Sequence, residues 1–459
     1  MPPGPELPAD QAGSDGAVST EELTAVRVLF VTIPWRSHLH LVVSTAWGLQ
    51  AAGHEVRVAS GPELTEVITS SGLTAVPVGS DEPIMEKLER LQDADVLRKV
   101  EELAERGDLL VDMSENREEE LTWERLRWAY RMYRKTHAAM NDSMVEDLVE
   151  YSRWWKPDLV VWDWLSYAGS IAATAVGAAH ARMPIGLNVE AQMRANYLRV
   201  REQQAPQERE DPLGDWLGEW ARKYGKPFSE EMVTGHFTID QMVGSMVLTS
   251  DVPHLAIDYV AYNGPSVEPD WTRSTPSKPR VLATFGVSLE QAERHQALSI
   301  DQLQGMLDSV ADLDIELVLT LPAQLQKRLE RVPDNTRMVE FVPLHVIIPS
   351  CSAVLHHGGI GPFLDSIAHD VPQLMVSRVL PDIGERGPRL EAAGAGRWIS
   401  GDDPEELSGA SIREHLVRLL EDPAFREGAG KLREELNAQP TPAEAVRELE
   451  ARAHRYRTR

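Results

Sequence analysis

Runs of β-branched and apolar residues alternate with helix-favouring segments twice along this chain, and this alternation constrains the fold more than any other feature. Residues 26–33 form a nearly continuous run of this kind, which suits a strand buried on both faces. A helical pattern at 41–52, a strand at 54–60, a helix at 63–71 and a strand at 73–78 follow. This order predicts an α/β fold built on a doubly wound parallel sheet.

The first alternation continues beyond a long charged stretch. Residues 81–151 are charged and helix-favouring, and they predict two or three helices beside the sheet. Residues 159–164 and 183–187 are expected to be further strands. The polar, tryptophan-bearing segment 197–225 is expected to be mobile, and 242–249 to form a short strand.

The alternation restarts after a stretch dense in Pro, Ser, Gly and Asn, which is typical of a linker between domains. The expected division is a disordered leader (1–24), a first domain (25–262), a linker (263–279), a second domain (280–438) and a C-terminal helix that crosses back to the first domain (439–459). Ligands of such sheets bind at the carboxyl ends of the strands. The predicted site is therefore a cleft between the two halves.

The net charge and the single cysteine limit the partners and the compartment. With 46 basic and 72 acidic side chains among 459 residues, the formal charge is -26, which disfavours nucleic acid or an anionic membrane as a partner. Cys351 alone cannot make a disulfide framework or a cysteine-based metal site, and it fits a reducing cytoplasm. No apolar run reaches the ~18 residues of a membrane span. We therefore expect a cytoplasmic protein.

A strand, a glycine-rich turn and a helix follow one another at residues 352–364, and this order can build an anion site. The glycines let the backbone approach a phosphate, whose charge the free N–H groups and the dipole of the following helix stabilise. His357 is placed to donate to the same oxygens, and Pro362 is expected at the first helical position. The alternative is a glycine turn that serves tight packing alone.

His38 and Asp163 are the candidate catalytic residues. Each is expected at the carboxyl end of a strand of the first sheet, so the carboxylate could orient the imidazole and stabilise its protonated form during general-base catalysis. The alternative is a surface histidine and an unrelated helix-capping aspartate. His40 competes with His38 as the base, and spacing does not exclude it.

Several other classes of site are disfavoured by the motifs that the sequence lacks. There is no G-x-G-x-x-G after the first strand, which disfavours an NAD enzyme, and no G-x-x-x-x-G-K-[ST], which disfavours a P-loop nucleotidase. His356 and His357 have no carboxylate or cysteine companions at metal-ligand spacing, so phosphate contact is favoured over a metal. Trp35 and Trp164 could line a pocket for a large apolar acceptor, although most of the tryptophans are expected to pack in the core.

Four motifs in the same order resemble those of the two-domain inverting glycosyltransferases of actinobacterial natural-product pathways. Within that group the chain looks most like the macrolide deoxysugar and aminosugar transferases of the desosaminyl, mycaminosyl and forosaminyl type. The similar stretches are 53–60, 157–163, 356–361 and 389–396, and the resemblance extends over about residues 26–450. It implies the GT-B fold, in which two Rossmann-like domains face each other across a cleft.

The resemblance also implies an activity and roles for particular residues. The enzyme would move a deoxysugar from a dTDP donor, its co-substrate, to a hydroxyl of a polyketide or macrolide aglycone, with no metal and no further cofactor. His38 matches the family's base and Asp163 its supporting aspartate. The remaining matches are Ser288, His357, Gly359, Ile360 and Gly361 near the diphosphate, Phe341 and Val342 in the segment that holds the nucleotide base, and Asp382 beside the donor sugar.

Two departures from the family pattern concern the donor. Pro362 stands where a Thr or Ser hydroxyl is usual, and Ile383 where Asn or Gln is usual, so a less polar pocket would suit a sugar stripped of hydroxyls. Some macrolide relatives act with a cytochrome-P450-like helper protein, and the helices at 81–151 could bind one. A homodimer is also left open. The alternatives are a nucleotide-sugar 2-epimerase and a catalytically silent scaffold partner with the same fold.

Overall fold

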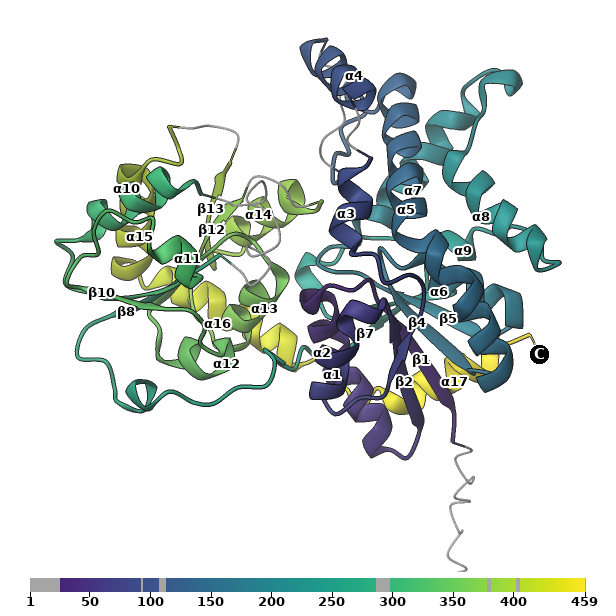
Figure 1. Cartoon of the computed structure of the whole chain (residues 1–459). Coiled ribbons are helices and arrows are strands. Elements are labelled where there is room, and N and C mark those ends of the chain that lie inside the picture. The colour runs from purple at the N-terminus through teal and green to yellow at the C-terminus, as the bar shows by residue number, and fades with distance from the viewer. Residues whose placement is uncertain are drawn as a thin grey trace, which may run out of the picture.

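Two parallel sheets organise the chain, as the sequence predicts. The computed structural model describes residues 25–91, 94–106, 113–285, 298–377, 381–401 and 405–458. One sheet has seven strands and the other six, and each carries its own helices (Figure 1). The predicted α/β class with two doubly wound domains is confirmed.

The first sheet has the order β3-β2-β1-β4-β5-β6-β7, and all its strand pairs are parallel. Its strands are β1 (Arg27–Val31), β2 (Glu55–Ser60), β3 (Ala75–Pro77), β4 (Leu159–Asp163), β5 (Ala179–Met183), β6 (Phe237–Asp240) and β7 (His254–Ala256). The order reverses between β1 and β4, which lie side by side although 131 residues separate Val28 from its partner Leu159. This neighbourhood brings the ends of two distant segments together.

Ten helices accompany this sheet within the described residues. They are α1 (Arg36–Ala51), α2 (Thr65–Ser70), α3 (Ile84–Glu89), α4 (Ala94–Glu105), α5 (Trp123–Trp155), α6 (Tyr167–Val176), α7 (Val189–Glu202), α8 (Pro212–Lys223), α9 (Glu231–Thr234) and α17 (Val446–Tyr456). The charged stretch forms three of them, as expected. The longest, α5, begins at the capping side chain of Thr122 and ends at Lys156, whose φ of 55° stops the helix.

The second sheet has the order β10-β9-β8-β11-β12-β13 and is also parallel throughout. Its strands are β8 (Arg280–Thr284), β9 (Glu316–Thr320), β10 (Thr336–Val339), β11 (Ala353–His356), β12 (Gln373–Ser377) and β13 (Gly396–Ser400). Its helices are α10 (Ile300–Val310), α11 (Ala323–Gln326), α12 (Leu344–Ile347), α13 (Ile360–Ala368), α14 (Ile383–Ala392), α15 (Gly409–Glu421) and α16 (Ala424–Asn437).

The two domains share one hydrophobic cluster. Leu187 and Val189 of the first domain pack in it with Ile360, Phe363 and Ile383 of the second. Burial of apolar surface stabilises such a contact by about 25 cal/mol per Å², so the domains are held together and not merely tethered. The turn after β5 thereby meets the helices that follow β11 and β12.

The C-terminal helix α17 returns to the first domain, beneath whose sheet it runs in Figure 1. Val446, Leu449 and Ala453 pack into the same cluster as strands β1 and β5. His54, which precedes β2, places its Nε2 2.8 Å from Oε1 of Glu450 in a buried pair. A polar contact thus supplements the apolar face that holds this helix.

Two expectations about local structure are wrong. The strand expected at 183–187 is β5, and it begins four residues earlier, because Gly177 ends α6 at a φ of 70° and the buried His180 and Arg182 interrupt the apolar pattern. The segment 197–225 contains the end of α7 and all of α8, and its mobility stays a prediction. Residues 242–249 contain a 3-10 turn, Gly244–Met246, in place of a strand.

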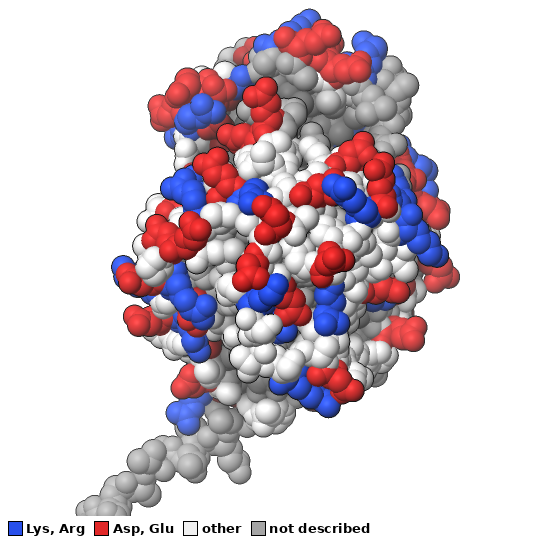
Figure 2. All heavy atoms as spheres, turned by 90° about the vertical axis from the view of Figure 1, so that its left-hand side faces the viewer, with Lys and Arg blue, Asp and Glu red and all other residues white. Residues whose placement is uncertain are grey.

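The surface of the second domain mixes both signs of charge. Figure 2 views this side of the molecule, and acidic and basic side chains alternate across it without a continuous basic patch. In the part of the chain that the structure describes, no helix is long and apolar enough to cross a membrane.

Candidate active site

His38 lies in the first turn of α1 and not in a loop before it, because α1 begins at Arg36, five residues earlier than expected. The helix follows β1, and Asp163 ends the neighbouring strand β4. As carboxyl ends of adjacent parallel strands share one edge, the two side chains meet. Nδ1 of His38 lies 3.3 Å from Oδ2 of Asp163, and both residues are buried.

Asp163 also organises the turn in which it lies. Its Oδ2 accepts hydrogen bonds from the N–H of Ile33 (3.0 Å) and the hydroxyl of Ser166 (3.0 Å), and its Oδ1 accepts one from the N–H of Leu165 (2.8 Å). These three donors fix the carboxylate beside His38, although the Nδ1 contact itself is not aligned as a hydrogen bond. The alternative of an unrelated, surface histidine is wrong, since His38 is 6% exposed and touches the aspartate.

His40, the competing base, faces another way. It lies edge-on to the ring of Tyr262, 5.2 Å between centroids, and close to Gly264 of the linker. Burial and the charge of Arg36 lower the pKa of His40 to about 4. Within the part of the chain that the structure describes, no carboxylate pairs with His40 as Asp163 does with His38, so the geometry favours His38.

Trp35 and Trp164 flank the His38–Asp163 pair. The indole of Trp35 meets the His38 ring edge-on, with centroids 5.3 Å apart, and both tryptophans pack on the small cluster that contains Ile33 and Leu165. Neither indole N–H has a hydrogen-bond partner within the described structure. A buried donor without a partner costs free energy, so these two N–H groups are suited to an oxygen of a bound molecule.

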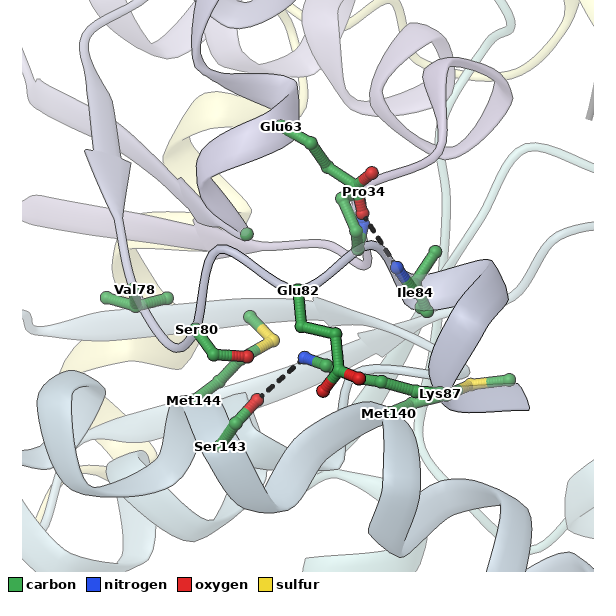
Figure 3. Close-up of a pocket in the computed structure, with 11 residues that line it drawn as sticks. Pro34, Glu63, Val78, Ser80, Glu82, Ile84, Lys87, Met140, Ser143 and Met144 are labelled. Atoms are coloured by element: carbon green, nitrogen blue, oxygen red, sulfur yellow. Dashed lines mark hydrogen bonds between the residues drawn. The ribbon is translucent and has the colours of Figure 1, made fainter. Parts of the chain in front are cut away.

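A pocket opens beside this pair, at the carboxyl ends of β1 to β3. Figure 3 shows it between Pro34, the start of α3 and two turns of α5. Met140 and Met144 give it an apolar wall, while Lys87 donates a hydrogen bond of 3.1 Å to Ser143 at its rim. The pocket has room for about one water molecule, so a larger molecule could enter only if the flexible methionine side chains move.

The two histidines of the glycine turn after β11, His356 and His357, have different surroundings. His356 is fully buried; its Nδ1 accepts from the N–H of Gly358 at 3.0 Å, and its Nε2 lies 2.8 Å from Oε1 of Gln373. It therefore holds the turn, in which Gly358 has a φ of 85° that only glycine adopts without strain. His357 is partly buried, with its ring against Gly359.

The helix that begins at this turn is α13, with Gly359 as its N-cap and Ile360 as its first residue. Pro362 is the third helical residue and not the first, so it removes one of the free N–H groups of the first turn. Among the described residues, the N–H groups of Ile360 and Gly361 have no acceptor in the chain. Burial and the charge of Arg386 lower the pKa of His357 to about 4, so its imidazole is neutral near pH 7.

Asp382 is the N-cap of α14 and is almost fully buried. Its Oδ1 accepts a hydrogen bond from Arg386 (3.0 Å), and its Oδ2 accepts one across the domain interface from the N–H of Leu187 (3.0 Å). The side chain of Ile383 packs in the shared interdomain cluster. Asp382 thus lies where the two domains meet, and its contact with a donor sugar stays a prediction.

Three further residues are expected near the nucleotide, and the structure gives only the positions of two of them. Phe341 and Val342 follow β10, at the same edge of the sheet as the glycine turn; the Phe341 side chain is exposed, and that of Val342 is buried in a second cluster. Ser288 lies outside the described residues. The roles of all three stay predictions.

Two buried polar residues at the interface were missed from the sequence. Arg386 pairs with Asp382 and lies over the ring of Phe363, 4.9 Å from its centroid. Glu190, in the first turn of α7, is 6% exposed and has an oxygen without a partner in the described structure. An acidic residue at a helix start usually faces solvent. Both residues follow strand ends that meet at the domain interface. Recognising this requires the arrangement of the strands, which the sequence alone does not provide.

Profiles of one family match most of the chain. The N-terminal domain of the erythromycin biosynthesis protein CIII-like family matches residues 47–286, and its C-terminal domain matches residues 304–452. The chain belongs to this family. The resemblance inferred from the four motifs is thereby confirmed.

Relatives in this family are similar along their full length. The chain is 41% identical to 10-deoxymethynolide desosaminyltransferase of Streptomyces venezuelae, over 94% of this chain and 98% of that one. It is 40% identical to aclacinomycin-T 2-deoxy-L-fucose transferase of Streptomyces galilaeus, over 93% and 96%. The protein is a glycosyltransferase, and its relatives are deoxysugar transferases of antibiotic biosynthesis.

Solved structures agree with the family. The glycosyltransferase VinC in complex with dTDP superposes with a TM-score of 0.81 at 38% identity, over 94% of this chain and all of that one. The spinosyn forosaminyltransferase SpnP superposes with a TM-score of 0.76 at 32% identity, over the same shares. Both are structures of the GT-B type predicted for this chain.

Proposed function

We propose that this protein is an inverting glycosyltransferase that moves a deoxysugar from dTDP to a hydroxyl of a polyketide aglycone, in antibiotic biosynthesis. The observation that carries the proposal is the contact between Asp382 and Leu187. This contact brings the carboxyl ends of β12 and β5 together. The edge of the second sheet that holds the glycine turn before α13 therefore meets the edge of the first sheet that holds the His38–Asp163 pair. An anion site and a general base on facing edges fit group transfer between a nucleotide sugar and an alcohol.

In the proposed reaction each domain has one role. Nε2 of a neutral His38 takes the proton of the acceptor hydroxyl as its oxygen attacks the anomeric carbon, and Asp163 stabilises the imidazolium that forms. The diphosphate leaves from the opposite face of the sugar. Its charge is stabilised by the N–H groups of Ile360 and Gly361 and by the dipole of α13. His357 contributes as a neutral group until an anion raises its pKa from about 4.

The donor and acceptor classes rest on the relatives. One is a desosaminyltransferase acting on 10-deoxymethynolide, another a tylactone mycaminosyltransferase, and one related structure holds dTDP. We infer a dTDP-deoxysugar as co-substrate and a macrolide or related polyketide as acceptor. Trp35, Trp164 and the methionine wall beside them would bind the aglycone. No separate cofactor or metal enters this scheme, and in the described residues no three His, Cys, Asp or Glu side chains are grouped as metal ligands.

Two partner interactions belong to the same proposal. A cytochrome-P450-like helper would bind the helices α3, α4 and α5, which extend from the first domain in Figure 1. A homodimer is the other assembly. The rival functions, a nucleotide-sugar 2-epimerase and a silent scaffold, find no support among the relatives named above, which are transferases.

A calorimetric titration with dTDP, UDP and NAD in parallel tests the donor. Selective binding of dTDP is expected. His357→Ala should weaken dTDP binding about tenfold, as loss of one hydrogen bond to a charged group does. His369→Ala, at the other end of α13, is the matched control and should leave the affinity unchanged. A preference for UDP would contradict the donor assignment, and a lack of binding to all three would contradict the proposed transferase.

A further inference from the structure

Asp365 is a fully buried carboxyl group that the proposed reaction does not use. It lies in α13, five residues after Ile360. Its Oδ1 accepts a hydrogen bond from the hydroxyl of Tyr259 (3.3 Å), and its Oδ2 accepts one from Nδ2 of Asn263 (3.0 Å). Both of these donors are uncharged, and burial raises the pKa of the carboxyl group to about 7. Such burial is costly, so packing alone does not account for an aspartate at this position.

The two donors lie on the other side of the domain boundary from α13. Tyr259 and Asn263 belong to the segment that follows β7, the last strand of the first sheet, and they precede Asp365 by 106 and 102 residues. Asn263 also accepts, at its Oδ1, a hydrogen bond from the N–H of His345 (3.0 Å) in α12. Both ends of the Asn263 amide are therefore bonded to the second domain, which fixes its orientation.

The helix that carries His38 packs at the same place. Leu41 of α1, three residues after His38, lies in one hydrophobic cluster with Tyr259 and with Ile360 and Phe363 of α13. The glycine turn, which is the proposed diphosphate site, leads directly into α13. This cluster thus joins the helix of the proposed base to the helix of the proposed anion site, and the polar contacts of Asp365 lie beside it.

Apolar contact alone does not define how two helices stand relative to each other. Burial of apolar surface has no preferred direction, and apolar cores tolerate changes in packing. Hydrogen bonds instead require a donor and an acceptor at about 2.7–3.2 Å and in line. A shift of α13 by one residue along its axis, about 1.5 Å, would break both bonds of Asp365. A buried polar group is therefore suited to select one register between the two domains.

We propose that Asp365, together with Tyr259 and Asn263, is a positioning residue that fixes the glycine turn of α13 at one distance from His38. This inference rests on the proposed function, because the glycine turn is the proposed site of the diphosphate. Asp365 touches no substrate and acts through the helix in which it lies. The base and the leaving group must stand on opposite sides of the sugar, and a misplacement of about 1 Å can cost about 10²-fold in rate.

A double variant separates this role from a role in stability. Asp365→Leu with Tyr259→Phe replaces both partners of a buried hydrogen bond by apolar groups, which can be nearly neutral for folding. Asn263 is half-buried and can bond to water instead. kcat should fall about 10- to 100-fold, because the two half-sites lose their register. The affinity for dTDP should stay within about twofold, since the glycine turn remains intact within the second domain.

Steady-state kinetics and calorimetry on one preparation measure both quantities. The substrates are the pair that the unaltered protein turns over fastest in a panel of dTDP-6-deoxyhexoses and macrolactones. Asp365→Asn keeps the shape and an acceptor for Asn263, so it should retain part of the rate. Glu435→Gln is the matched control, since Oε2 of Glu435 accepts from the N–H of Ser245 (2.9 Å) in an exposed contact between the domains; kcat should not change.

The possible outcomes are distinct. An unchanged kcat in the double variant, or a parallel loss of kcat and of dTDP affinity, would overturn the inference. Should the double variant not fold, Asn263→Ala removes the second hydrogen bond from a half-buried position and should lower kcat in the same way, with dTDP affinity retained. If the unaltered protein turns over no pair of substrates, the proposed function fails instead.

Discussion

His38 and Asp163, which stand 125 positions apart in the sequence, lie with Nδ1 and Oδ2 3.3 Å from each other at the edge where β1 and β4 end. The carboxylate is held by two donors of its own turn and by the N–H of Ile33 after β1, so its position does not depend on the histidine. An imidazole beside such a fixed carboxylate keeps one orientation and presents Nε2 to a substrate. This arrangement makes separate predictions for the two residues.

His38→Ala should lower kcat by about 10²- to 10⁴-fold, the usual contribution of a general base. The affinity for dTDP should stay within about twofold, because His38 is in the other domain from the glycine turn. Steady-state kinetics and calorimetry on one preparation measure both. His40→Ala is the matched control, since His40 belongs to the same helix but packs on Tyr262. If His40→Ala loses turnover and His38→Ala does not, the assignment of the base is reversed.

Asp163→Asn should reduce both turnover and stability. The amide presents an N–H₂ where the carboxylate accepts from Ile33, Leu165 or Ser166, so a bond is lost and a donor faces a donor; the cost is about 1–3 kcal/mol in the free energy of unfolding. Ser166→Ala removes one of these bonds without touching His38. Denaturant unfolding should therefore show both variants destabilised, whereas kcat should fall strongly only in Asp163→Asn. If kcat falls equally in Asp163→Asn and Ser166→Ala, Asp163 serves only to hold the turn and has no separate role in catalysis.

This pair could be predicted from the sequence because each of its residues follows a strand that a local apolar pattern identifies. Continuous apolar runs identify buried parallel strands, and the order of a doubly wound sheet makes the first strand a neighbour of a later one. The same reasoning missed β5, where His180 and Arg182 are buried through contacts with distant residues. It missed Glu190 as well, because a carboxylate in the first turn of a helix is ordinarily solvated, whereas Glu190 is 6% exposed.

Gly186→Ala should loosen the interface between the domains. At a φ of 97° an alanine is strained, and its Cβ would lie 2.3 Å from Oδ2 of Asp382, so the contact that joins Leu187 to Asp382 must open. We expect a larger radius of gyration in solution scattering and weaker donor binding. Gly225→Ala is the control, since its φ of 74° imposes the strain while the space around it is open. If both variants behave alike, backbone strain and not the interface explains the effect.

Glu450→Ala should destabilise the packing of α17 on the first domain. Glu450 is the partner of the buried His54, whose other ring nitrogen accepts from the N–H of Val26. Leaving a buried polar group without its partner costs about 1–3 kcal/mol. Glu448→Ala, which breaks an exposed pair with Arg452 on the same helix, should cost under about 1 kcal/mol. Thermal unfolding compares the two, and equal costs would mean that the buried pair adds nothing to the apolar contact of α17.

Stability should rise with pH between about 4 and 6.5, because several histidines are buried in their neutral form. Burial lowers the pKa of His137 and of His356 to about 3, and that of His357 to about 4. In this interval the unfolded chain binds more protons than the folded one at these sites, so acid favours unfolding. Glu190 and Asp365 oppose the trend, since burial raises the pKa of each to about 7 and the folded chain then binds the extra proton.

Burial also lowers the pKa of His40 to about 4 and that of His180 well below its usual value, and it raises the pKa of Asp258 to about 6. These five histidines outnumber the three carboxyl groups, so their direction should prevail. The midpoint of thermal unfolding, followed from pH 4.5 to 8, is expected to increase up to about pH 6.5 and then to level off. His137→Gln removes one buried base from the core and should flatten the rise, whereas His454→Gln, at an exposed position of α17, should leave the slope as it is. A midpoint that falls as the pH rises through this interval would show that Glu190 and Asp365 dominate, and that these histidines are not kept neutral by burial.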